Sequence, residues 1–126
     1  MSESFRDLLV WQRAIQMSLA IYRFTTGFPK EELFGLTGQI RRAGVSVASN
    51  IAEGYGRNST GEYKHFLGMA RGSNSEVETQ LVIAKELGYG NPQALKEAED
   101  LCTEVGKMLR AILSKLEGKN SQPASP

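Results

Sequence analysis

The feature that most constrains the fold is a segment near the middle of the chain, residues 39–57, which has apolar side chains on two sides of a helix. One stripe recurs at spacings of three and four: Leu36, Ile40, Ala43, Val47 and Ile51. A second stripe lies on a different side: Phe34, Val45, Ala48, Ala52 and Tyr55. A surface helix of a small monomer needs only one apolar stripe. The segment is therefore expected to lie between two partners, either inside its own fold or between subunits.

Small side chains line the same segment: Gly38, Ala43, Gly44, Ser46, Ala48, Ser49 and Ala52. An interior glycine costs a helix about 1 kcal/mol relative to alanine. Close approach of a second backbone offsets that cost, and we expect close packing at Gly38, Gly44, Ala48 and Ala52. The alternative is that the glycines are merely tolerated.

Four stretches show helical periodicity, and none shows the alternation of a β-strand. The helices are predicted at about residues 7–26, 30–55, 60–87 and 92–117. The turns between them carry helix signals, such as the capping box of Ser59 and Glu62 and the Asn91-Pro92 pair. Short loops favour antiparallel neighbours, so the expected fold is all-α, an up-down-up-down four-helix bundle over residues 1–118. Residues 119–126 are predicted to form a disordered tail.

Length, charge and cysteine content bear on the number of domains, the partners and the compartment of the protein. The 126 residues suggest one domain, and the net charge of +1 demands neither a nucleic-acid nor a membrane partner. Charge is uneven, because residues 1–75 hold nine basic against six acidic side chains. The single cysteine fits a reducing cytoplasm, and no apolar run is long enough to cross a membrane. The N-terminal residues also lack the layout of a signal peptide, so a cytoplasmic protein with no membrane partner is expected.

The residues that catalysis or metal binding requires are not found in a convincing arrangement. Glu62 and His65 have the Glu-x-x-His spacing of di-iron bundles, but such a centre needs a second motif, and the chain has one histidine. Glu62 is better explained by its capping role. Cys102 has no histidine near it in sequence and is expected to be a buried, inert thiol. We therefore predict no catalytic residue, metal or cofactor, and hence no enzyme.

A polar set accompanies the apolar stripes: Gln39, Ser46, Asn50, Glu53 and, on the next helix, Glu76. Ser46, Asn50 and Glu53 share one helix face, and residues 73–78 supply a matching polar section. The favoured interpretation is a set of inter-helix or inter-subunit hydrogen bonds that fixes the register of packing. A ligand pocket and a solvated face are the alternatives.

Basic side chains gather on the second and third helices and their turn: Arg41, Arg42, Arg57, Lys64 and Arg71. Arg57 and Lys64 lie near Tyr55 and Tyr63 in sequence, and basic groups beside aromatic rings can hold phosphates and stack bases. The alternative is a solvated face with ion pairs. In a ring the same residues would recur around an axis and strengthen the local field.

Several short runs resemble the four-helix bundle proteins of the 23S rRNA intervening-sequence family. They are Leu9-Val10-Trp11-Gln12, residues 28–32, residues 39–43, Ser49-Asn50-Ile51-Ala52-Glu53-Gly54 and residues 76–81. The resemblance covers roughly residues 5–117 and implies a bacterial homopentameric bundle whose biochemical role is not established. A related accessory protein of diversity-generating retroelements is similar and is thought to bind nucleic acid and a reverse transcriptase. That relative is strongly basic, whereas this chain is not.

The expected function is a non-enzymatic homo-oligomeric bundle, a pentamer by resemblance, that serves as a binding or scaffold module. RNA or DNA is the expected partner class, held through arginines repeated around the ring. The alternative is a protein-binding adaptor with no nucleic-acid ligand.

Overall fold

The computed structural model describes residues 4–120, and this part of the chain is all-α with no strand. Its long helices are α1 (Leu9–Thr25), α2 (Leu36–Tyr55), α3 (Thr60–Glu86) and α4 (Pro92–Asn120). Two short 3-10 turns, η1 (Phe5–Asp7) and η2 (Lys30–Glu32), precede α1 and α2.

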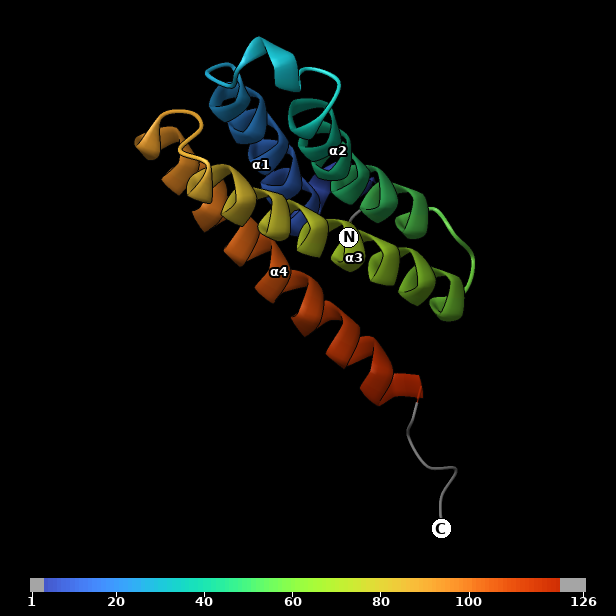
Figure 1. The fold of residues 1–126 in the computed structure, drawn as a ribbon. Coiled ribbons are helices and arrows are strands. Elements are labelled where there is room, and N and C mark those ends of the chain that lie inside the picture. The colour runs from blue at the N-terminus through green and yellow to red at the C-terminus, as the bar shows by residue number, and fades with distance from the viewer. Residues whose placement is uncertain (1–3, 121–126) are drawn as a thin grey trace.

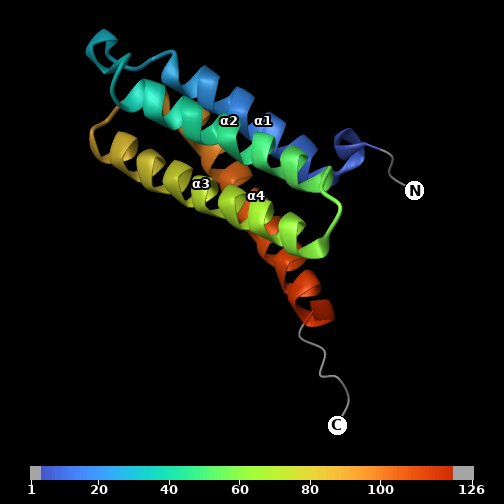
Figure 2. The ribbon, with the colours of Figure 1, turned by 90° about the vertical axis from the view of Figure 1, so that its right-hand side faces the viewer.

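The four helices pack around one core, each against its neighbours in sequence, and α4 also packs against α1. Figure 1 shows the α1–α2 and α3–α4 connections at one end of the molecule and the α2–α3 turn at the other. In the view of Figure 2, as in Figure 1, the last turns of α4 extend beyond the other helices. Helices α2 and α3 lie side by side in both views and pack against each other.

Apolar residues that recur at spacings of three and four form the core. In α1 they make one seam of five buried residues: Val10, Ala14, Met17, Ile21 and Phe24. From α2 the core receives Ile40, Val47 and Ile51, and from α4 it receives Val105 and Leu109. Burial of each large apolar side chain stabilises the fold by about 1.5–3 kcal/mol. The spacing of apolar residues thus sets which face of each helix points inward.

The predicted start of the second helix is wrong. Residues 30–32 form the 3-10 turn η2, the backbone of Gly35 is not helical, and α2 begins only at Leu36. The Oε1 atom of Glu32 accepts a hydrogen bond from the Leu36 backbone N–H at 3.1 Å. The carboxylate therefore caps α2 from the preceding turn instead of lying in the first turn of a longer helix. At the other end of the chain, α4 includes Lys119 and Asn120, so the predicted tail begins too early; its residues 121–126 lie outside the described part.

The junction between α3 and α4 follows from local chemistry. Gly88 has φ +73°, and the Tyr89 N–H donates to the Ala84 carbonyl, which gives α3 a Schellman-type end. The Oδ1 atom of Asn91 then accepts hydrogen bonds from the first turn of α4. At the start of α3, the Ser59 hydroxyl accepts from the Glu62 N–H at 3.1 Å, as the capping box predicts.

Glycine brings α2 close to both of its neighbours. A Cβ atom on Gly44 would lie 2.7 Å from Ile21 Cδ1 of α1, and one on Gly54 would lie 2.7 Å from Phe66 Cβ of α3. The close contact expected at Gly44 is thus made within the chain, and Ala48, one turn further, is also buried. The space beside Gly38 is occupied by its own segment, and Ala52 is half-buried.

Replacement of Gly44 by leucine should overpack the α1–α2 contact and lower the free energy of unfolding by about 1–3 kcal/mol. Gly118→Leu is the matched control, because an added Cβ at Gly118 meets nothing within 4 Å. Urea unfolding followed by circular dichroism measures both. Equal stability of the two variants would show that the Gly44 contact is not tight.

Candidate functional site

The predicted basic residues do not form one patch. Arg41 lies on the α1 side of α2, where its Nε–H donates to Thr25 Oγ1 at 2.8 Å. Its guanidinium carbon is 4.6 Å from the centre of the Tyr22 ring. Arg42, the next residue, lines a groove on the α3 side of α2 instead. Consecutive residues of a helix point about 100° apart, so this divergence follows from helix geometry.

Two of the basic residues are paired with carboxylates. Arg57 forms an ion pair with Glu53 and lies over the Phe66 ring, 4.8 Å from its centre. Lys64 Nζ is 2.9 Å from Glu117 Oε1. Arg71 is exposed on α3 and forms no ion pair with a described residue. The ion-pair interpretation of the basic set thus describes Arg57 and Lys64, but not Arg41, Arg42 or Arg71.

The polar set forms a small network between α2 and α3. The hydroxyl oxygens of Ser46 and Ser73 are 3.0 Å apart. Asn50 Nδ2 donates to the Ser46 carbonyl at 2.9 Å and to its hydroxyl at 3.0 Å. The Ser46–Ser73 bond joins the two helices at one register within the chain, and the Asn50 bonds within α2 hold Ser46 in place. Glu53 takes no part, because its carboxylate faces Arg57.

A groove of about 300 Å³ continues this network along α2 and α3, and Gln39, Arg42 and Glu76 line it. Gln80 also lines the groove, and its Oε1 atom is buried without a hydrogen-bond partner among the described residues. An unpaired buried acceptor costs about 1–3 kcal/mol, so a donor from outside the chain is favoured there. Gln80 could not be predicted from the sequence, since a polar residue at a core-side position leaves no periodic signal.

Asn74 belongs to the polar section of residues 73–78, but its side chain is buried against α4. Its Nδ2 atom donates to the Cys102 carbonyl at 3.0 Å, and the Cys102 thiol lies 3.6 Å from the Asn74 carbonyl oxygen. Gly106 leaves room for this amide, because a Cβ there would lie 3.1 Å from Asn74 Nδ2. The pair fixes α3 against α4 and leaves Asn74 without a free polar group for a ligand.

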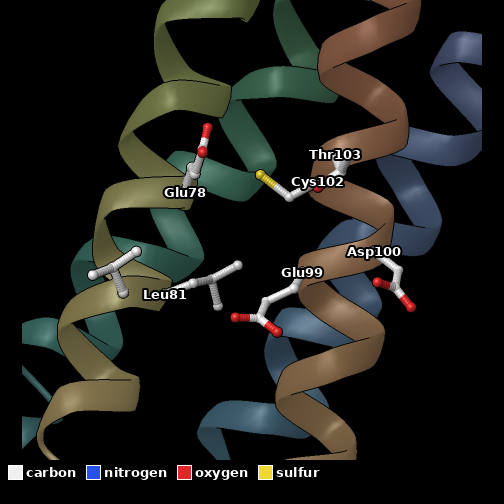
Figure 3. A pocket seen from close by; sticks show the side chains of 7 residues that line it. Glu78, Leu81, Glu99, Asp100, Cys102 and Thr103 are labelled. Atoms are coloured by element: carbon white, nitrogen blue, oxygen red, sulfur yellow. The ribbon is translucent and has the colours of Figure 1, made fainter.

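A pocket of about 330 Å³ between α3 and α4 is the strongest candidate for chemistry, and Figure 3 shows Glu78, Glu99 and Cys102 lining it. Burial, and secondarily the charge of Glu78, raises the pKa of Cys102 to about 12. A thiol with this pKa is almost wholly protonated at neutral pH and is a poor nucleophile. In Figure 3 the Asp100 carboxylate points away from the sulfur. The pocket therefore lacks an activated nucleophile.

The described residues contain no group of three or more side chains suited to holding a metal ion. His65 is exposed and packs edge-on against Phe66, with ring centres 5.2 Å apart. Glu62 is engaged with Ser59 at the start of α3. The Glu-x-x-His spacing is therefore accounted for by capping and by ring packing.

Apolar side chains are exposed on the outer faces of α2 and α3. The exposed fractions are 44% for Val45, 46% for Met69 and 44% for Ile83. Gly68 and Gly72 lie on the same helix as Met69, and an added Cβ at either would meet nothing within 4 Å. The predicted second stripe is thus divided: Ala48 is buried within the chain, whereas Val45 is open to solvent.

The chain resembles known proteins in both sequence and fold. The sequence profile of the 23S rRNA-intervening sequence protein family matches residues 6–111. The chain belongs to this family. The match begins in η1 and ends within α4, so it includes the grooves and polar contacts described above except the Lys64–Glu117 ion pair.

A solved structure supports the same fold. It is the crystal structure of a protein with unknown function from the S23 ribosomal protein family of Bacteroides thetaiotaomicron, with a TM-score of 0.74 and 23% identity. The alignment covers 83% of this chain and 98% of that one. Neither this description nor that of the family names a reaction, and no curated protein matches the chain.

No helix in the described part is long and apolar enough to cross a membrane.

The raised pKa predicts that Cys102 is unreactive in the folded protein. At pH 8 about one thiol in ten thousand is ionised if the pKa is about 12, so reaction with a disulfide reagent should be slow. Addition of urea should restore the rate of a free cysteine. A native rate close to that of glutathione would contradict the burial of this thiol.

Proposed function

We propose that the chain is an up-down-up-down bundle that assembles as a homo-oligomeric ring, of five copies by family resemblance. We propose further that the ring is a non-enzymatic binding or scaffold module for RNA or DNA. The observation that carries the proposal is the exposed side of α2 and α3, which carries open glycines, exposed apolar side chains and two arginines, Arg42 and Arg71, that form no ion pair with a described residue.

Two exposed glycines of α3, Gly68 and Gly72, favour assembly. Each costs the helix about 1 kcal/mol relative to alanine, and no contact within the chain requires either one. A second helix can approach α3 closely where side chains are missing. It would then cover Met69 and Ile83, the exposed apolar side chains of the same helix α3. The unpaired Gln80 oxygen in the neighbouring groove would accept a donor from such a partner. A second copy of the chain would supply a closely packed helix, a cover for the exposed apolar side chains and a hydrogen-bond donor.

Three arginines without a carboxylate partner among the described residues favour a nucleic-acid ligand. Arg41, Arg42 and Arg71 form no ion pair with a described residue, so their charges are available to phosphates. One chain carries a net charge of only +1, and repetition around a ring would bring these side chains into a stronger field. The same low net charge favours the alternative, a protein-binding adaptor with no nucleic-acid ligand. Retention of a partner from nuclease-treated lysate, together with no RNA binding, would favour the adaptor.

Assembly is tested by substitution of the open glycines. Light scattering should give a mass that is a multiple of 13.8 kDa, and Gly68→Gln with Gly72→Gln should shift it toward smaller species. Glutamine is a good helix former, so the circular dichroism spectrum should not change. Ser114→Gln on the exposed side of α4 is the control and should leave the mass unchanged. A monomer at micromolar concentration would refute the ring.

Nucleic-acid binding is tested with structured RNA in a fluorescence anisotropy titration. Affinity should fall steeply with salt, and Arg41→Glu with Arg42→Glu should abolish most of the binding, because two phosphate contacts become repulsive. Lys107→Glu on α4 serves as a control for a change in net charge at an exposed position. Equal loss in the control, or no binding by the unmodified protein at low salt, would count against the proposal.

A further inference from the structure

A second pocket, of about 390 Å³, lies where the end of α1, the turn η2 and the start of α2 meet. Phe28 and Leu33 form part of its apolar wall, and Lys30 and Arg41 are its two basic residues. This pocket is separate from the groove between α2 and α3 and from the pocket at Cys102. Nothing in the bundle core requires a cation at this position.

The charge of Arg41 is not neutralised within the described chain. Its Nε–H is used by the Thr25 hydroxyl and one face of its guanidinium by the Tyr22 ring, but no described carboxylate lies within ion-pair distance. The neighbouring Glu32 is engaged elsewhere, since it accepts from the Leu36 N–H and from the Tyr89 hydroxyl. A half-buried guanidinium without a counter-charge attracts an anion, and its terminal nitrogens still carry donors.

A second donor points to the same place. Thr37 lines the pocket and is only 4% exposed, yet its hydroxyl makes no hydrogen bond to a described residue. The hydroxyl oxygen keeps access to the pocket, because Gln80 Oε1 is the only fully buried side-chain oxygen or nitrogen atom without a partner in the described part. A ligand in the pocket can therefore replace the water that this hydroxyl binds. Lys30, at the exposed edge, adds an ammonium group that also lacks an ion pair with a described residue. A guanidinium, an ammonium and a hydroxyl around one space suit the several oxygens of a phosphate.

The surface beside the pocket suits a base. Phe34 directly follows Leu33 in the chain and is 92% exposed, the largest exposure among the large apolar side chains of the described part. Phe34 is also four residues from Lys30 in the chain. Exposed aromatic rings combined with basic groups can bind single strands, because every base has a face that can stack.

We propose that this pocket holds one phosphate of a single-stranded nucleic acid, with an adjacent base stacked on Phe34. The inference rests on the proposed function and narrows it to a strand class and a subsite. Lys30, Arg41 and Thr37 bind the phosphate, and the Phe34 ring selects unpaired bases over a duplex, whose bases are already stacked.

The test compares a short fluorescein-labelled single-stranded RNA with its duplex at low salt. Phe34→Ala should weaken single-strand binding about tenfold and leave duplex binding unchanged. Lys30→Ala and Thr37→Val should weaken single-strand binding as well, and Lys30→Ala should reduce its salt slope by about 1. Phe34 and Lys30 are exposed, so these variants should fold normally. Leu9→Ala, an exposed apolar residue at the start of α1, is the control.

The outcomes separate this inference from the function on which it rests. If the unmodified protein binds neither RNA, both proposals are wrong. If it binds RNA and loses affinity in Arg42→Glu or Arg71→Glu, but not in the Phe34 and Lys30 variants, nucleic-acid binding stands and the pocket is wrong. Equal weakening of single-strand and duplex binding by Phe34→Ala would show that the ring does not stack on bases.

Discussion

Helix α2 can lie against both α1 and α3 because it lacks a side chain at each point of closest approach. At Gly44 the Ile21 side chain of α1 occupies the space of a Cβ atom, and at Gly54 the Cβ of Phe66 does so from α3. These approaches set the distance at which the remaining contacts form. The Arg41–Thr25 hydrogen bond joins α2 to α1, and the Ser46–Ser73 hydrogen bond joins α2 to α3.

The geometry of the helices also determines which charges are paired within the described chain. Arg57 follows Glu53 by one turn, and Lys64 faces Glu117 at the extended end of α4, so both are neutralised by geometry that the bundle itself fixes. Arg41 is held between a threonine hydroxyl and a tyrosine ring, neither of which carries charge. The basic set therefore divides into residues that stabilise the bundle and residues that remain available to a ligand, and sequence proximity to tyrosine does not tell the two groups apart.

Much of the fold could be predicted from the sequence, because a period of 3.6 residues marks the buried face of each helix wherever that face is apolar. The spacing found the Val10 to Phe24 seam for this reason. It could not find Gln80 or Asn74, which are polar residues at core-side positions, nor the start of α2, where a carboxylate from η2 acts as the cap. Gly44 and Gly68 look alike in sequence. Only the three-dimensional structure shows that the space beside Gly44 is filled by α1, whereas the space beside Gly68 is open.

The two proposed binding surfaces use different sides of α2, and this follows from the 100° step between Arg41 and Arg42. Arg41 turns toward α1 and the pocket below η2, whereas Arg42 turns toward α3 and the groove that contains Gln80. A copy of the chain docked along α3 would cover the groove without occupying the pocket at Lys30 and Thr37. Because the pocket recurs once per subunit, a ring would present its phosphate sites at a fixed spacing, and a single strand long enough to reach two of them would bind with the effective concentration of a linked ligand.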